Sequence, residues 1–161
     1  MSDEYFCGFV DGEGCFYVGF SKRPDLPGYW QVLTEFHLSQ NLSGINVLEA
    51  FRRRLGCGYL KPNHPGSQRD RSWILIVKDR KDLKLKLIPF FVENPLRTVK
   101  YKDFLVFKEV IELIEKQEHL NAAGFRKIVD LVFSLHRTTK KKYSKEEITS
   151  GTSETICQIP I

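Results

Sequence analysis

The hydrophobic pattern changes period near residue 14, and this change constrains the fold more than any other feature. Residues 2–11 carry apolar side chains at helical spacing behind a capping Ser2: Tyr5, Phe6, Phe9 and Val10. From residue 15 to residue 22, the apolar Phe16, Val18 and Phe20 alternate with small or polar residues. Such alternation is the period of a strand with one buried face. The chain is therefore expected to begin with a helix that leads directly into a sheet.

A second strand is predicted at residues 29–40, after a run of turn residues at positions 23–28. Its buried face would carry Val32, Thr34, Phe36 and Leu38, and its polar face Gln31, Glu35, His37 and Ser39. Two short strands are predicted at residues 58–61 and 72–78. Between the second and third strands, Ser43 is expected to cap a helix that ends at Gly56.

The remaining segments are expected to be mostly helical. Two helices have clear apolar faces, formed by Phe104, Phe107, Ile111 and Ile114 and by Phe125, Ile128, Val129 and Val132. A helix at residues 81–91 is less clear, because Leu83, Leu85 and Leu87 alternate as in a strand, and Pro89 and Pro95 are expected to bracket a bend. From residue 140 onward we expect a mobile, basic tail.

Helices packed on one face of an antiparallel sheet make an α+β fold. The length of 161 residues suits one domain, taken as residues 1–136, followed by a basic, polar C-terminal tail at residues 137–161. The second face of the sheet would be left to solvent or to a ligand.

Composition narrows the function classes. The net charge of +5 and the pI near 9.0 favour a polyanionic partner. The four cysteines form no CxxC pair, which argues against a zinc site and favours reduced thiols. No apolar run long enough for a membrane span and no secretory leader is recognisable. We therefore expect a cytoplasmic or organellar-matrix protein that is not secreted. Without a phosphate-binding glycine loop, no nucleotide cofactor is expected.

Two glycines on the first helix suggest self-association. Gly8 and Gly12 are four residues apart and share one helix face. Glycine costs a helix about 0.8–1.0 kcal/mol relative to alanine, so two on one face need a reason, such as close approach of another backbone. Because the chain has one such helix, we expect the partner to be the same helix of a second subunit, with Asp11 also in the interface.

Two acidic residues, Asp11 and Glu13, stand at the end of this helix. A carboxylate there faces the negative pole of the helix dipole, and a bound cation would offset that. Mg²⁺ accepts one or two carboxylates, carbonyl oxygens and phosphate oxygens, so Glu13, the Gly12 carbonyl and a scissile phosphate would suit it. The alternative is a tight helix-to-strand turn with a capping Asp11 and an exposed Glu13.

Residues 6–14, Phe-Cys-Gly-Phe-Val-Asp-Gly-Glu-Gly, resemble the motif of the LAGLIDADG homing endonucleases, and the element order from residue 2 to residue 134 resembles their core. The resemblance implies an αββαββα fold with a saddle-shaped sheet and a single-motif homodimer, encoded within an intron. It implies Mg²⁺ at Glu13 and Gly12, with Mn²⁺ or Ca²⁺ able to take its place. It also implies that Gln40 orders water and that Lys100, or alternatively Lys102, lies near the scissile phosphate. Gly44 stands where some members have an active-site arginine.

The resemblance further implies that the polar sheet face and its loops read double-stranded DNA in the major groove. The candidate DNA-binding residues are Tyr17, Ser21, Arg23, Gln31, Glu35, His37, Ser39, Lys61, Asn63, Arg69, Lys78, Lys140, Lys141 and Lys142. His37 is expected to contact bases rather than act as a general base, because no partner carboxylate accompanies it in the sequence.

The leading hypothesis is a metal-dependent, site-specific endonuclease that cuts a long pseudo-palindromic DNA site, with Glu13, Gln40 and Lys100 as catalytic residues. One alternative is an intron RNA maturase, which would bind its host intron RNA, or a DNA-binding regulator that does not cut. Another is an oligomeric α+β protein whose glycines serve packing only.

Overall fold

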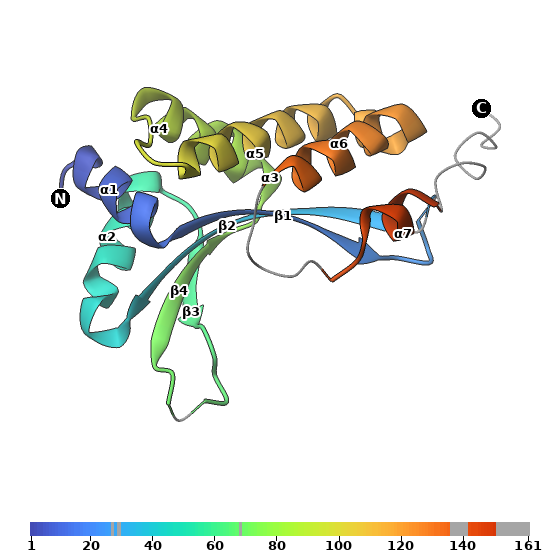
Figure 1. The fold of residues 1–161 in the computed structure, drawn as a ribbon. Coiled ribbons are helices and arrows are strands. Elements are labelled where there is room, and N and C mark those ends of the chain that lie inside the picture. The colour runs from blue at the N-terminus through green and yellow to red at the C-terminus, as the bar shows by residue number, and fades with distance from the viewer. Residues whose placement is uncertain (27, 29, 68, 136–141, 151–161) are drawn as a thin grey trace. The chain divides into compact units, whose positions relative to one another are not determined.

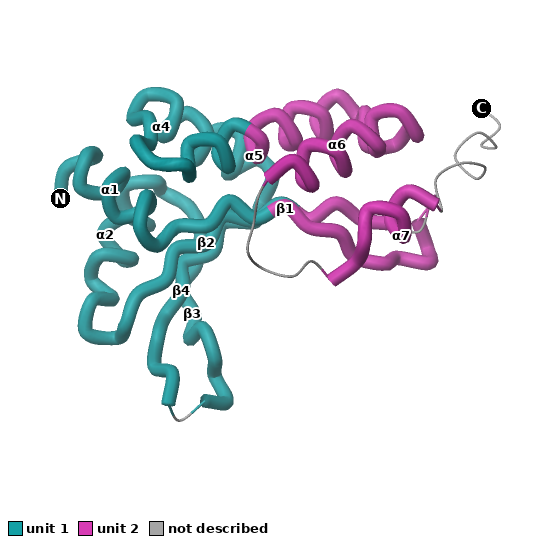
Figure 2. The backbone as a smooth tube through the Cα atoms, viewed as in Figure 1, with its two compact units in different colours: residues 1–17, 34–105 teal, residues 18–33, 106–161 magenta. Residues whose placement is uncertain are grey.

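The computed structural model describes residues 1–26, 28, 30–67, 69–135 and 142–150. Its four-stranded antiparallel sheet has the order β1-β2-β4-β3, and helices precede, interrupt and follow it (Figure 1). This confirms the α+β class. The chain groups into two compact units, one formed by Met1–Tyr17 and Thr34–Leu105, the other by Val18–Leu33 and the chain from residue 106 (Figure 2).

Helix α1 spans Asp3–Glu13, two residues further than the sequence predicts. Ser2 caps it as expected, because its hydroxyl accepts a hydrogen bond from the Tyr5 N–H at 3.3 Å. Phe6, Cys7 and Val10 are buried. The helix therefore buries one stripe and leaves the opposite stripe exposed.

Strands β1 (Gly14–Lys22) and β2 (Trp30–Asn41) alternate between buried and accessible side chains. In the first unit, Phe16, Phe36 and Leu38 are at most 1% exposed. The rings of Phe36, Phe91 and Phe104 lie 5.3–5.4 Å from that of Phe16, centroid to centroid. Aromatic pairs at this separation add to the free energy of burial. This cluster is the centre of the core beneath the sheet.

Helix α2 spans Ile45–Leu55 and follows a 3₁₀ turn at Leu42–Gly44. The prediction that Ser43 caps α2 is wrong, because Ser43 lies inside the 3₁₀ turn and Gly44 precedes the helix without a side-chain cap. Gly56 ends α2 in the left-handed conformation, with φ of 66°, as predicted. Arg54, in the last turn of α2, binds the Asp3 carboxylate through two hydrogen bonds of 2.6 and 2.8 Å.

The short strands are β3 (Tyr59–Pro62) and β4 (Ser72–Val77). Strand β4 lies between β2 and β3, with Leu38 opposite Leu75 and Leu75 opposite Leu60. Residues directly opposite each other point to the same sheet face. This register fixes which side chains of three strands share the accessible face.

Residues 80–93 are helical throughout, as α3 (Arg80–Asp82), a π-helical turn (Leu83–Leu87) and α4 (Ile88–Glu93). Leu83 and Leu87 are fully buried, whereas Leu85 is 57% exposed. The leucine alternation thus reflects two buried positions four residues apart on a helix. Pro89 lies in the first turn of α4, where proline is tolerated, and α4 ends at Glu93. The chain then bends at Asn94, which confirms the bend predicted between Pro89 and Pro95.

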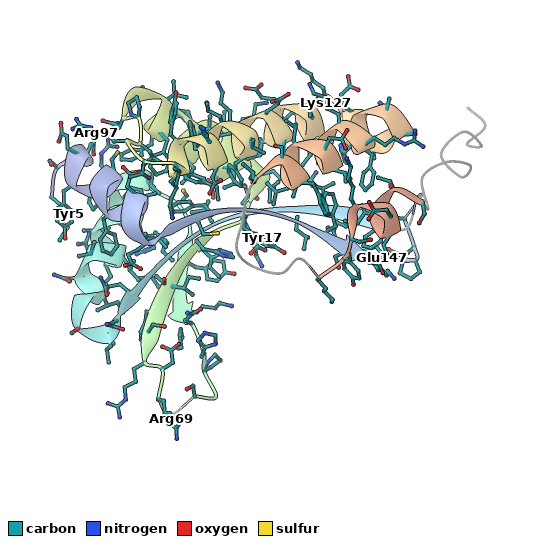
Figure 3. The ribbon with its side chains drawn as sticks, in the orientation of Figure 1. Tyr5, Tyr17, Arg69, Arg97, Lys127 and Glu147 are labelled. Carbon is teal, nitrogen blue, oxygen red and sulfur yellow. The ribbon has the colours of Figure 1, made fainter. Side chains whose placement is uncertain are left out.

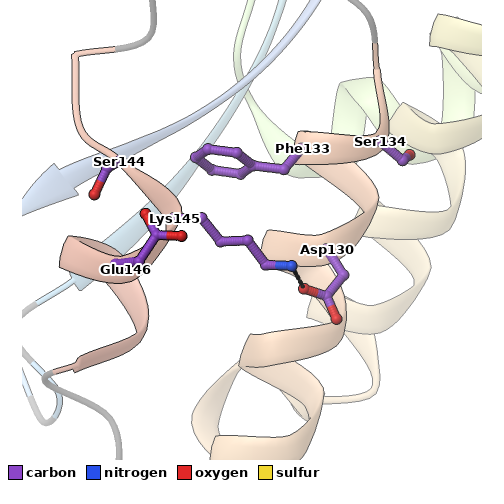
Figure 4. A pocket seen from close by; sticks show the side chains of 6 residues that line it. All are labelled: Asp130, Phe133, Ser134, Ser144, Lys145 and Glu146. Carbon is purple, nitrogen blue, oxygen red and sulfur yellow. Dashed lines mark ion pairs between the residues drawn. The ribbon is translucent and has the colours of Figure 1, made fainter.

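The second unit contains the C-terminal part of α5 (Lys100–Glu115), a 3₁₀ turn at Glu118–Leu120, α6 (Ala122–Ser134) and α7 (Lys145–Ser150). The predicted apolar faces of α5 and α6 are buried. Residues 142–150 correct the expectation of a mobile tail. Ser144 and Glu147 form a reciprocal capping pair, Ile148 is 1% exposed, and Lys145 binds Asp130 of α6 at 2.9 Å (Figure 4).

Among the described helices, none has the length and apolar character needed to cross a membrane. Cys7, Cys15 and Cys57 form no disulfide bond within the described residues. Burial raises the pKa of Cys7 and that of Cys57 to about 11, which keeps both thiols protonated near neutral pH.

The end of α1 is joined to the segment before α5 by the Asp11 carboxylate. It accepts hydrogen bonds from the N–H of Arg97 (2.9 Å), the N–H of Thr98 (3.3 Å) and the hydroxyl of Thr98 (2.7 Å). Thr98 Oγ1 in turn accepts the Lys100 N–H at 3.2 Å. Three bonds to one carboxylate fix the start of α5 against the end of α1.

We expect Asp11→Ala to lower the free energy of unfolding by about 1–2 kcal/mol, since bonds to a charged acceptor contribute more than neutral ones. Urea denaturation at one protein concentration measures the change. Asp25→Ala is the matched control, because Asp25 pairs with Arg23 in an exposed turn, where ion pairs contribute little. A loss for Asp11→Ala no larger than that of the control would contradict a stabilising role for the three hydrogen bonds to Asp11.

Candidate functional site: the end of helix α1 and the open sheet face

The junction between α1 and β1 depends on Gly14. Its backbone is extended, with φ of −77° and ψ of 156°, and its N–H donates to the Val10 carbonyl. A Cβ on Gly14 would stand 2.6 Å from Val10 Cγ1 and 2.8 Å from the Val10 carbonyl oxygen. Only glycine lets the chain turn from helix into strand so tightly. The turn presents the preceding residue, Glu13, at the end of the helix.

Glu13 is exposed, and its side chain has no hydrogen bond or ion pair within the described part of the chain. Carbonyls in the last turn of a helix, that of Gly12 among them, also lack helical partners. A free carboxylate beside such carbonyls, at the negative end of a helix, is a suitable position for a cation. The residues present therefore fit a divalent metal whose remaining ligands come from outside the chain.

Those outside ligands are needed, because no group of three or more His, Cys, Asp or Glu side chains that could hold a metal occurs among the described residues. Mg²⁺ commonly binds through one or two carboxylates together with water and phosphate oxygens. One carboxylate per chain matches that pattern. Asp11 is used within the chain by the Arg97–Thr98 segment, which leaves Glu13 as the free acid of the pair.

Lys100 reaches the same junction from α5. Its Nζ donates a hydrogen bond of 2.5 Å to the carbonyl of Gly14, the residue after Glu13. Lys102 is exposed, and its ammonium group forms no hydrogen bond or ion pair within the described residues. The geometry therefore favours Lys100 over Lys102 as the cation beside the acid.

Gln40 stands near the end of β2, opposite Trp73. Its side-chain oxygen accepts the Asn41 N–H at 2.7 Å, and no hydrogen bond joins it to Glu13 in the described structure. A Cβ on Gly44 would lie 2.7 Å from Gln40 Cγ. Any side chain at position 44, an arginine included, would therefore require Gln40 to shift.

The accessible face of the sheet collects most of the predicted DNA-binding residues of the first unit. The alternation of β1 and β2 and the register of β2, β3 and β4 place seven of them on this face: Tyr17, Glu35, His37, Ser39, Lys61, Asn63 and Lys78. Asn63 lies just beyond β3, where its amide donates to Ser72 Oγ at 3.2 Å. Figure 3 labels Tyr17 on this sheet and Arg69 at the loop after β3.

His37 has a partner that sequence reasoning missed. Its Nε2 lies 2.7 Å from Glu35 Oε2, and its ring stacks on that of Tyr17 at 5.9 Å with an interplanar angle of 10°. The statement that no carboxylate accompanies His37 is therefore wrong. Residues two apart on a strand share a face, so the sequence already contained the signal.

Tyr59 is a second residue that sequence reasoning missed. It faces Ile76 across the sheet, is 41% exposed, and lies beneath Lys78 Nζ at 5.6 Å from the ring centroid. Tyr59, Lys61 and Asn63 are spaced two residues apart, as residues on one face of a strand are. This pattern could have identified Tyr59 from the sequence. Tyr59 adds an aromatic ring to the polar face.

The second unit holds the other candidates. Arg23 binds Asp25 through two hydrogen bonds and donates a third, of 3.2 Å, to Gln31. This pairing holds the pKa of the Asp25 carboxyl low, at about 2. Ser21 lies on β1. Lys142 is exposed beside the Tyr143 ring, whereas Lys140 and Lys141 lie outside the described residues.

Known proteins resemble this chain along most of its length. A "probable intron-encoded endonuclease 2" of Neurospora crassa is 30% identical over 132 residues, which is 81% of this chain and 26% of the relative. The chain thus spans about a quarter of the length of that curated relative. The crystal structure of a homing endonuclease, I-TnaI, superposes with a TM-score of 0.79 and 34% identity, covering 94% of this chain and 95% of the other.

An archaeal intron-encoded homing endonuclease, I-Vdi141I, was solved in complex with DNA. It superposes with a TM-score of 0.83 and 27% identity and covers 93% of both chains. The family model described as LAGLIDADG endonuclease matches residues 6–111, which include α1, its glycines and Glu13. The match extends over more than half of the sequence, and the chain belongs to the LAGLIDADG endonuclease family.

Proposed function

We propose that this chain is a site-specific homing endonuclease that hydrolyses double-stranded DNA at a long pseudo-palindromic target, with Mg²⁺ and as a homodimer. The observation that carries the proposal is the α1–β1 junction. There the unpartnered Glu13 carboxylate stands next to the Gly14 carbonyl that Lys100 Nζ contacts. An acid that can hold a metal and a lysine that can offset the charge of a phosphate are groups that metal-dependent phosphodiester hydrolysis uses.

Each chain residue has a distinct task in this proposal. Glu13 and the Gly12 carbonyl would hold the metal, which when bound lowers the pKa of water and stabilises the leaving oxygen. Mn²⁺ or Ca²⁺ would occupy the same ligands. Lys100 would move from the Gly14 carbonyl to the scissile phosphate and offset its charge, and Gln40 would orient water.

DNA as the substrate is supported by the open sheet face and by the charge of the chain. The face carries Lys61, Lys78 and several neutral donors and acceptors, and the net charge is +5. Cationic groups supply affinity for phosphates, and uncharged polar groups read base edges. The DNA complex of I-Vdi141I, which shares the fold, fits this assignment.

The homodimer is supported by the exposed stripe of α1. Neither Gly8 nor Gly12 would bring an added Cβ within 4 Å of another atom, so the described chain itself gives no reason for either glycine. Tyr5, on the same helix, is 49% exposed and stacks on Phe9. A second α1 packed here would explain both the glycines and the exposed rings, and would place two Glu13 residues near each other.

Glu13→Gln should abolish cleavage in Mg²⁺ and leave DNA binding intact, because the amide binds divalent metals poorly but preserves shape. Cleavage and gel-shift assays on a plasmid library measure both. Glu4→Gln, at the other end of α1, is the control and should cut normally. Cleavage by Glu13→Gln would exclude the metal-ligand role, and loss of DNA binding by the folded variant would make Glu13 structural. If the wild type cuts nothing yet binds intron RNA, the maturase alternative is correct.

Lys100→Met should slow single-turnover cleavage by roughly 10²–10³-fold, the usual effect of removing one electrostatic contact to a reacting oxygen. Lys102→Met, two residues along the same helix, should change the rate little. Equal effects of the two substitutions, or a larger effect at position 102, would show that the wrong lysine has been assigned.

Gly8→Leu should weaken the dimer without unfolding the chain. The side chain meets open space within one chain and replaces a poor helix former, but it would separate two packed α1 backbones. Sedimentation velocity at micromolar concentration should show monomer for Gly8→Leu and dimer for the wild type. Arg53→Leu, an exposed position of α2, should remain dimeric. A monomeric wild type, even with DNA, would refute the homodimer.

A further inference from the structure

Three side chains on the open sheet face form a preorganised cluster: Tyr17 on β1 and Glu35 and His37 on β2, here called the Tyr17–His37–Glu35 cluster. The Tyr17 ring lies nearly parallel to the imidazole and fixes its plane. The imidazole Nε2 lies 2.7 Å from Glu35 Oε2 and fixes the carboxylate. The side chains of Glu35 and His37 are 28% and 26% exposed, so the cluster can be reached from outside.

Glu35 is the unusual member, because a carboxylate on a face that binds DNA is repelled by phosphates. Glu35 lies next to His37. Because Phe36 pairs with Val77, Lys78 is in the same cross-strand row as Glu35. Both neighbours reduce that repulsion. Only Oε2 is used by His37 in the described structure, so Oε1 remains available as an acceptor. The cluster therefore presents a fixed hydrogen-bond acceptor, not a cation, toward the ligand.

A fixed acceptor in the major groove selects among the four bases. Guanine offers the acceptors N7 and O6, and thymine offers O4, so both oppose a carboxylate. Adenine offers its N6 amino group, but its N7 acceptor lies beside it. Cytosine offers its N4 amino group without a neighbouring acceptor, and acidic side chains pair with it for this reason.

We propose that the Tyr17–His37–Glu35 cluster is a specificity determinant that reads the exocyclic amino group of a cytosine, with Glu35 as the contacting residue and His37 and Tyr17 as positioning residues. The proposal rests on the proposed DNA function. In a homodimer the cluster occurs twice, so the cytosine occurs at the same position of both half-sites.

An imidazole paired with a carboxylate is also the arrangement of a general-base pair. Within the described residues, however, no hydrogen bond links the cluster to Glu13, Lys100 or Gln40, and the stacked Tyr17 holds the imidazole among the base-facing side chains. The two roles differ in their consequences: a reader of bases changes which sequence is chosen, whereas a general base changes the rate on every sequence.

The test is selection of bound DNA from a randomised library, in Ca²⁺ to prevent cleavage, with the full chain carrying Glu35→Gln. The wild type should enrich cytosine at one position of each half-site. Glu35→Gln should lose that preference by roughly 5- to 150-fold, the usual discrimination of one good base contact, and should favour adenine there, since glutamine pairs with adenine N6 and N7.

Two further variants localise the effect. His37→Asn should weaken the same preference at the same position, because Glu35 loses the group that orients it. Ser39→Ala, on the same face, should leave the cytosine position unchanged. The proposal would be overturned if Glu35→Gln enriched the same bases as the wild type. It would also be overturned if Glu35→Gln lost cleavage but kept the cytosine preference. A wild type that enriches no sequence would instead defeat the DNA function itself.

Discussion

The hydrogen bonds of the Asp11 carboxylate determine the geometry on which the rest of the site depends. They join the last turn of α1 to the Arg97–Thr98 segment. The Thr98 hydroxyl accepts a hydrogen bond from the backbone N–H of Lys100, and the Lys100 side chain donates one to the Gly14 carbonyl. The result is a closed ring of contacts around the turn that presents Glu13. Asp11 holds this ring and Glu13 stays free, so two acids of one motif have different tasks. The same helix exposes its glycines on the stripe that the ring does not use.

The two faces of the sheet also have different roles. Its buried side supports the aromatic core around Phe16, and its accessible side carries polar groups at alternate positions of three strands. Because the strand period is two, a single residue fixes the face of every other residue in its strand. The Tyr17–His37–Glu35 cluster is a product of this register. In the proposed DNA function it makes an acidic residue, which would weaken phosphate binding, a source of selectivity.

Much of this could be predicted from the sequence, since local patterns determine it. Strict alternation predicted both faces of β2, and helical spacing predicted the buried faces of α5 and α6. Gly56 predicted the end of α2. Other features escaped local patterns because two local signals compete or because a contact is distant in sequence. Ser43 suits a helix cap but lies in a 3₁₀ turn, and the leucines of residues 83–87 fit either period. The Asp11–Thr98 bond spans 87 residues, so no local pattern could reveal it.

The central claim is that Glu13 and Lys100 meet a divalent metal and a DNA phosphate at the end of α1. Anomalous diffraction from a crystal of the chain with Mn²⁺ and its selected DNA tests this most directly. The claim predicts an Mn²⁺ peak coordinated by the Glu13 carboxylate and the Gly12 carbonyl, with Lys100 Nζ on a phosphate oxygen. An Mn²⁺ ion bound elsewhere, with Glu13 remote from the DNA, would contradict it.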